Sequence, residues 1–171
     1  MQTRLTWNDL LIQNISESNG RDWLGLWQGT IKSKVAPKFM SKFGDWFLQL
    51  PDGSTNELSV IEGTYSKIAS TPEEFAGLVN TAKWQEEHLM SLIVQQLHDR
   101  KIVAQAGQCC AFVPHPVLAG RIDVDSAMLM DIGVWQHICA QTVSIGCGRR
   151  EKFDAALAQV PDALPVPGDE L

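Results

Sequence analysis

Four histidines and four cysteines are the first side chains of this sequence to consider for chemistry. His88 and His98 fall on one predicted helix, but ten residues and nearly three turns separate them, so they cannot jointly hold one metal ion. Neither an HExxH motif nor a CxxC spacing occurs. The sequence therefore predicts no metal site and no cofactor.

A cysteine and histidine enzyme is one alternative that the sequence leaves open. His115 sits between Pro114 and Pro116, in a stiff loop able to present an imidazole, and Cys109 and Cys110 precede it closely. Such a pair would suit a small hydrolase-like enzyme. Against it, the two cysteines belong to an apolar predicted strand, where burial raises the pKa of a thiol and opposes formation of the thiolate nucleophile.

Carboxylates offer a second chemical alternative. Asp123 and Asp125 are alternate residues, so on an extended segment they would face the same side and could act as an acid and base pair. The segment Arg121–Ser126 is better explained as a solvated loop that caps the next element of the chain. The glycines form no phosphate-binding fingerprint, which disfavours nucleotide binding.

The elements around these residues begin with a predicted antiparallel meander. Phe43–Leu50 is aromatic and apolar, and the Pro51-Asp52-Gly53 turn follows it. Glu57–Ile61 alternates polar and apolar residues, Glu62-Gly63 breaks the run, and Thr64–Ala69 has strand character again. We therefore expect three consecutive antiparallel strands.

After Ala69, the spacing of the apolar residues changes from that of strands to that of helices. A hydroxyl, a proline and two acids in Ser70–Phe75 predict a helix start near Pro72, and Lys83–Asp99 carries apolar residues at helical spacing. Cys109–Val113 returns to strand character, at an edge because prolines follow it. Glu151–Val160 is compatible with a helix, and the prolines after it predict an extended or disordered end.

These elements predict an α+β fold. We expect a mainly antiparallel sheet of four to six strands, two helices from about 72 to 99 packed on one face, and a short N-terminal helical region. The domain is expected over 1–150, with 151–171 as a helix-compatible stretch and proline-rich tail. The predicted core consists of Trp46, Phe47, Leu48, Ile61, Ile68, Phe75, Leu78, Trp84, Leu92, Ile93 and Phe112.

Several segments together resemble one bacterial family. In order they are FGDWFLQLPDG (43–53), IASTPEEF (68–75), GQCCAFVPHPVLAG (107–120) and MLMDIGVWQHICAQ (128–141). They resemble a family of domains of unknown function that is similar to the C-terminal domain of immunity proteins against type VI secretion DNase toxins. The resemblance covers about 34–141, with Ala119 and Ala140 where the family has glycine. It implies a non-catalytic protein that neutralises a toxin.

Composition and charge agree with a binding protein of this kind. The 171 residues are 44% hydrophobic and 20% charged, with a net charge of −6. No basic stripe suits nucleic acid, and no apolar run suits a membrane, so we expect neither as a partner and place the protein in the cytoplasm. A basic toxin such as a nuclease is the expected partner. The candidate contacts are Asp52, Glu57, Glu62, Glu73 and Glu74.

Six tryptophans against one tyrosine leave a further alternative. Trp23 and Trp27 are four residues apart and share one face of a predicted helix. An amphipathic helix that docks on the sheet accounts for them. The alternative is an exposed aromatic platform through which a regulatory or assembly module docks.

Overall fold

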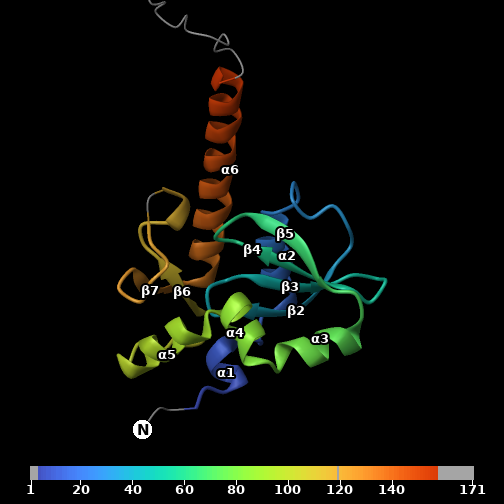
Figure 1. Ribbon diagram of the computed structural model, residues 1–171, viewed down its shortest axis with the longest axis vertical. Coiled ribbons are helices and arrows are strands. Elements are labelled where there is room, and N and C mark those ends of the chain that lie inside the picture. Colours follow the sequence, from blue (N-terminus) through green and yellow to red (C-terminus); the bar gives the residue numbers. More distant parts are fainter. Residues whose placement is uncertain (1–3, 119, 158–171) are drawn as a thin grey trace, which may run out of the picture.

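The computed structural model describes residues 4–118 and 120–157, with the backbone alone over 147–157. It has an α+β fold, as predicted, with a five-stranded sheet and a two-stranded sheet (Figure 1). In chain order, the elements are α1 (Trp7–Leu10), β1 (Leu11–Ile12), α2 (Glu17–Gly25), β2 (Ala36–Ser41), β3 (Trp46–Gln49), β4 (Thr55–Ser59), β5 (Thr64–Ala69), α3 (Pro72–Val79), α4 (Ala82–Leu89), α5 (Ser91–Asp99), β6 (Gln108–Phe112), the 3-10 turn η1 (Pro116–Leu118), β7 (Ala127–Asp131) and α6 (Ile132–Leu157).

The larger sheet is an antiparallel meander in the order β1-β2-β3-β4-β5. The three predicted strands are confirmed as β3, β4 and β5. In the first turn, the Asp52 carboxylate accepts hydrogen bonds from the backbone and hydroxyl of Ser54, and Gly53 has a φ of 85°. The pattern did not predict β2, because its first residues are exposed and Pro37 adjoins a register shift.

Alternation along the strands gives the larger sheet two different faces. Phe47 packs against Phe39 on the neighbouring strand and against Trp84 of α4, with ring centroids 4.8 and 5.4 Å apart. Phe75 of α3 lies 5.9 Å from Phe39. Helices α3 and α4 therefore contact this face of the sheet.

The opposite face of β3 is held to α6 and to the N-terminal segment through one amide side chain. Gln136 of α6 accepts hydrogen bonds from the indole N–H groups of Trp46 and Trp27, at 3.1 and 3.4 Å. Trp23 of α2 is partly buried and Trp27 is buried, but α2 ends at Gly25, so the prediction that both tryptophans share one helix is wrong. Helix α6 continues beyond the sheet (Figure 1).

A short connection over residues 41–45, the 41–45 turn, joins β2 to β3. Helix α6 bonds its backbone directly: Trp135 donates its indole N–H to the carbonyl oxygen of Phe43, and Gln136 donates to that of Gly44, both at 2.8 Å. Gly44 has a φ of 94°, and a Cβ there would lie 3.0 Å from each of those two side chains. Only glycine therefore fits this position without strain.

The smaller sheet pairs β6 with β7 in antiparallel register. It is joined to the larger sheet at the 41–45 turn, where the carbonyl oxygen of Lys42 accepts a 2.7 Å hydrogen bond from the backbone N–H of Cys110. The rings of Phe43 and Phe112 stack 5.1 Å apart across the same junction. The strand predicted over Cys109–Val113 is confirmed as β6.

The predicted single helix over Lys83–Asp99 is wrong, because Met90 adopts a left-handed conformation that divides it into α4 and α5. The carboxylate of Glu86 accepts hydrogen bonds from Ser91 Oγ and from the backbone N–H of Leu92, at 2.9 and 2.8 Å, and so satisfies the start of α5. The break turns Leu92 outward. Its side chain is 63% exposed, so its predicted place in the core is also wrong.

The C-terminal part of the sequence is described only in part. Helix α6 continues across residue 150 to Leu157, which includes most of the stretch predicted to be compatible with a helix. The predicted proline-rich tail lies outside the described residues. Within the described ranges, no helix has both the length and the apolar composition needed to cross a membrane.

The role of Gln136 can be tested by its removal. Gln136→Ala would leave two buried indole N–H groups and the Gly44 carbonyl without their partner, so we expect a loss of about 3 to 5 kcal/mol in the free energy of unfolding. Urea denaturation measures it. Gln141→Ala, an exposed glutamine on the same helix, is the matched control and should change stability by less than about 0.5 kcal/mol. Equal effects of the two substitutions would contradict this role.

Candidate functional site

The structure turns the predicted cysteine and histidine pair inward. Cys109 and Cys110 are 0% and 5% exposed, and burial raises the pKa of both thiols, that of Cys110 to about 11. His115 is 4% exposed, and burial lowers the pKa of its imidazole. Its ring lies against Trp135, and its Nδ1 accepts from the backbone N–H of Val117. The loop that was expected to present His115 therefore buries it.

The two predicted aspartates make separate structural contacts. Asp123 accepts hydrogen bonds from the backbone and hydroxyl of Ser126, at 2.8 and 2.7 Å, and these bonds lower the pKa of its carboxyl. Asp125 is paired with Arg100 at 2.6 Å. Asp123 therefore caps its own loop rather than the next element, and the two carboxylates bond different groups.

The structure separates the five candidate contact residues into groups. Asp52, Glu73 and Glu74 are exposed at one end of the sheet. Glu62 is also exposed, but it lies in the turn after β4, at the other end of that strand. Glu57 lies between them on β4, and its side chain is only 14% exposed. The structure thus brings three of the five together.

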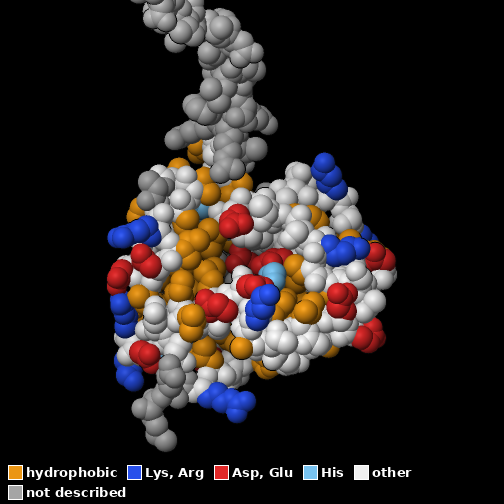
Figure 2. All heavy atoms as spheres, viewed as in Figure 1, with side chains coloured by type: hydrophobic (Ala, Val, Ile, Leu, Met, Phe, Trp, Pro, Cys, Tyr) orange, Lys and Arg blue, Asp and Glu red, His pale blue; other side chains and the backbone are white. Residues whose placement is uncertain are grey.

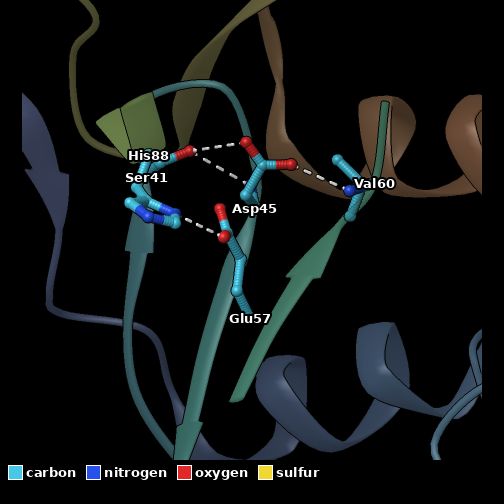
Figure 3. A network of polar contacts seen from close by, with 5 residues as sticks. All are labelled: Ser41, Asp45, Glu57, Val60 and His88. Atoms are coloured by element: carbon cyan, nitrogen blue, oxygen red, sulfur yellow. Dashed lines mark hydrogen bonds and ion pairs between the residues drawn. The ribbon is translucent and has the colours of Figure 1, made fainter. Parts of the chain in front are cut away.

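A buried carboxyl group that sequence analysis did not single out, that of Asp45, lies in the 41–45 turn. Asp45 is 3% exposed. One carboxylate oxygen accepts a 2.8 Å hydrogen bond from the backbone N–H of Val60, and the other lies 3.3 Å from Ser41 Oγ, which donates to it (Figure 3). Asp45 thereby ties the start of β3 to the end of the β4 strand.

Next to Asp45, a second carboxylate is paired with a histidine. Glu57 of β4 lies 2.6 Å from Nδ1 of His88, which comes from α4 (Figure 3). The His88 ring stacks on Trp84 with 4.7 Å between ring centroids. The hydrogen bond between His88 and Glu57 is the largest influence on the imidazole and raises its pKa, so the protonated imidazole is favoured.

Burial and charge act together on Asp45. Burial and the negative charge of Glu57 together raise the pKa of its carboxyl to about 7, against the lowering effect of the hydrogen bonds from Val60 and from serine side chains. Asp45 therefore exchanges a proton near neutral pH. Figure 2 shows acidic side chains and a histidine together in a hollow in the middle of one face.

Asp45, Glu57 and His88 together form a group that we name the central trio. Their side chains can bind protons and stabilise a positive charge. Among the residues that the structure describes, no group of three or more histidine, cysteine or acidic side chains is placed to hold a metal ion. The hydroxyl group of Ser41 donates to the Asp45 carboxylate and accepts from the backbone N–H of Phe43. The sequence did contain a signal for a buried carboxyl at residue 45. Asp45 lies among the aromatic residues Phe43, Trp46 and Phe47, which are expected to be buried.

Comparison with protein-family models and with curated proteins finds no match for this chain. Among solved structures, the chain is similar to the crystal structure of Atu4351 from Agrobacterium tumefaciens, with 15% sequence identity and a TM-score of 0.48. The similarity covers 72% of this chain and 64% of that chain, so the chain spans less than two thirds of that protein's length.

The buried carboxyl predicts how stability depends on pH. The folded state raises the pKa of Asp45 from 3.8 to about 7, so it favours the protonated form, and this stabilisation is lost as pH rises through that range. His88 acts in the same direction, because its raised pKa favours the protonated imidazole. We expect the wild type to be less stable at about pH 8 than at about pH 5.5.

Asp45→Asn should reduce the loss of stability that we expect as the pH rises. Its amide oxygen can still accept from Val60, while no charge has to be buried, so the variant should exceed the wild type in stability at about pH 8 and lose that advantage near pH 5. Chemical denaturation across this range is the measurement. Asp125→Asn, at an exposed carboxylate, is the control and should follow the wild type. A variant at residue 45 that parallels the wild type at every pH would show that Asp45 does not titrate as described.

Proposed function

We propose that this protein is a non-catalytic protein-binding domain that neutralises a basic partner, in the manner of immunity proteins against secreted bacterial toxins such as the DNases of type VI secretion. The observation that carries the proposal is the clustering of Asp52, Glu73 and Glu74, three exposed acids, where the β3–β4 turn meets the start of α3. We name these three residues the acidic end. Its action is proposed to take place in the cytoplasm.

Packing between the turn and the helix supports the acidic end as a single surface. A Cβ on Gly53 would lie 3.5 Å from Pro72 Cδ, so the turn that carries Asp52 and the first turn of α3 are in close contact. Glu73 and Glu74 both belong to that first helical turn. A basic partner would therefore meet three carboxylates on neighbouring segments.

Two of the three carboxylates are held in place before any partner binds. Asp52 is fixed by Ser54, whose hydrogen bonds, together with the nearby charge of Lys67, lower the pKa of its carboxyl. Glu74 accepts a 2.7 Å hydrogen bond from the backbone N–H of Ser70. Because these side chains already have restricted motion, less conformational entropy is lost when a partner binds them.

Exposed apolar side chains on the segment 113–128 also support protein binding. This segment comprises the connection between β6 and β7 and the start of β7. The exposed fraction is 43 to 49% for each of the side chains Val113, Val117, Leu118, Ile122 and Met128. Figure 2 shows hydrophobic side chains in a band on the same face as the acidic hollow. A combination of apolar and charged surface is typical of protein interfaces.

The arrangement of the alternative sites supports a non-catalytic role. The thiols of Cys109 and Cys110 favour the protonated form, and His115 is committed to Val117 and Trp135. Docking through tryptophans would have to use Trp7, which is 36% exposed, or the partly buried Trp23, because Trp27, Trp46, Trp84 and Trp135 are all at most 4% exposed. Binding through acidic and apolar surface is the function that these positions favour.

The test is affinity capture from cells that produce the protein, together with co-expression of the captured partner. We expect the wild type to retain a basic protein that is toxic when produced alone, and to restore growth when both are produced. Asp52→Lys, Glu73→Lys and Glu74→Lys combined should abolish retention. The matched control reverses Glu17, Asp22 and Asp99, three exposed acids on other helices, and should retain the partner.

Two results would count against the proposal in different ways. Equal capture by the wild type and both variants would exclude the acidic end as the contact surface. If the wild type captures no basic protein and restores growth with none, the neutralising function itself is contradicted.

A further inference from the structure

One lysine differs from the others in its part of the sequence. Lys32, Lys34 and Lys38 are exposed, whereas Lys42 is partly buried. The backbone of Lys42 is fixed on both sides, because its N–H donates to the carbonyl of Leu10 at 3.1 Å and its carbonyl accepts from Cys110 at 2.7 Å. The side chain therefore starts from a rigid position where β1, β2 and β6 meet.

Two cavities lie beside Lys42. The larger has a volume of about 420 Å³ and lies between α2, the segment that includes β1, and residues 104–108; the smaller has about 60 Å³. Lys42 lines both. The wall of the larger cavity is rich in carboxamide side chains, namely Asn8, Gln13, Asn14, Asn19, Gln105 and Gln108.

The charge of Lys42 is incompletely compensated. Over residues 4–118 and 120–146, its ammonium group forms no ion pair within 4.0 Å. Asp9 lines the smaller cavity with it, but the Asp9 carboxylate accepts two 2.6 Å hydrogen bonds from Thr6 and lies 3.6 Å from His98. The neighbouring Cys110 keeps its proton, since burial raises the pKa of its thiol to about 11.

A partly buried cation without a close counter-charge loses hydration and gains little in return. The consequence is visible at Lys42, where burial lowers the pKa of the ammonium group despite the opposing charge of Asp9. An anion in the adjoining cavity would supply the missing compensation. A charge-assisted hydrogen bond of this kind is stronger than a neutral one.

We propose that the cavity of about 420 Å³ binds a small organic anion, whose carboxylate or phosphate group pairs with the ammonium group of Lys42. The volume lies within the usual range for ligand pockets and suits a molecule of metabolite size. Carboxamide side chains both donate and accept, so they can bind the polar remainder of such a ligand. Trp23 adds an aromatic surface to the wall.

This site is independent of the proposed toxin neutralisation. The acidic end belongs to α3 and to the β3–β4 turn, neither of which lines the cavity. The two proposals also require ligands of opposite charge. A result that contradicts one proposal therefore does not contradict the other.

The experiment is a titration of the full chain with inorganic phosphate and, separately, with succinate, followed by NMR of the amide signals at constant ionic strength. We expect saturable shifts for at least one probe, centred on residues of the cavity wall such as Asn19 and Gly107. Phosphate binding alone or succinate binding alone identifies which anionic group the site accepts. Lys42→Met should weaken that binding by about tenfold or more.

Lys34→Met removes an exposed lysine of the same run and should bind like the wild type. Asn14→Ala, which alters the wall without touching the junction of the sheets, should weaken binding by a few-fold, and it keeps the test valid if Lys42→Met fails to fold. The proposal is overturned if neither probe saturates, if the shifts centre elsewhere, or if folded variants at residues 42 and 14 bind as tightly as the wild type.

Discussion

The fold depends on satisfying the buried polar groups of the 41–45 turn. Every carbonyl and N–H that this turn buries needs a partner, because an unpaired one costs about as much as a lost hydrogen bond. The partners come from distant elements: Leu10 and Cys110 bond Lys42, and Trp135 bonds Phe43. Gln136 bonds Gly44 and also holds Trp27 and Trp46. One short turn thus fixes the positions of both sheets and of α6.

The same turn brings opposite charges into the interior at adjacent places. Asp45 is held by Val60 and Ser41 on one side, and Lys42 lines the two cavities on the other. Within the described side chains, neither group forms an ion pair within 4.0 Å, so each charge is accommodated differently. Asp45 favours its protonated form, whereas Lys42 borders a cavity that can admit an anion. A rigid backbone at this turn is what allows both to be held away from bulk water.

The proposed binding surfaces lie away from this central turn. The acidic end is built on helix α3 and on a tight strand connection, and the exposed apolar side chains belong to the segment between β6 and β7. Surfaces on short connections can change in sequence without disturbing the buried hydrogen bonds. The folded state raises the pKa values of Asp45 and His88, so the stability of the scaffold depends on pH.

The sequence by itself determined the elements whose signals are local. Pro51-Asp52-Gly53 set the β3–β4 hairpin, and Thr71 with Pro72 set the start of α3, because a turn or a cap involves neighbouring residues only. Tertiary structure decided the rest. The break at Met90 depends on Glu86 reaching the start of α5, the pairing of Glu57 with His88 joins a strand to a helix, and the partial burial of Lys42 depends on β1 and β6. These contacts join residues far apart in sequence or on different elements, and periodicity along the chain carries no information about them.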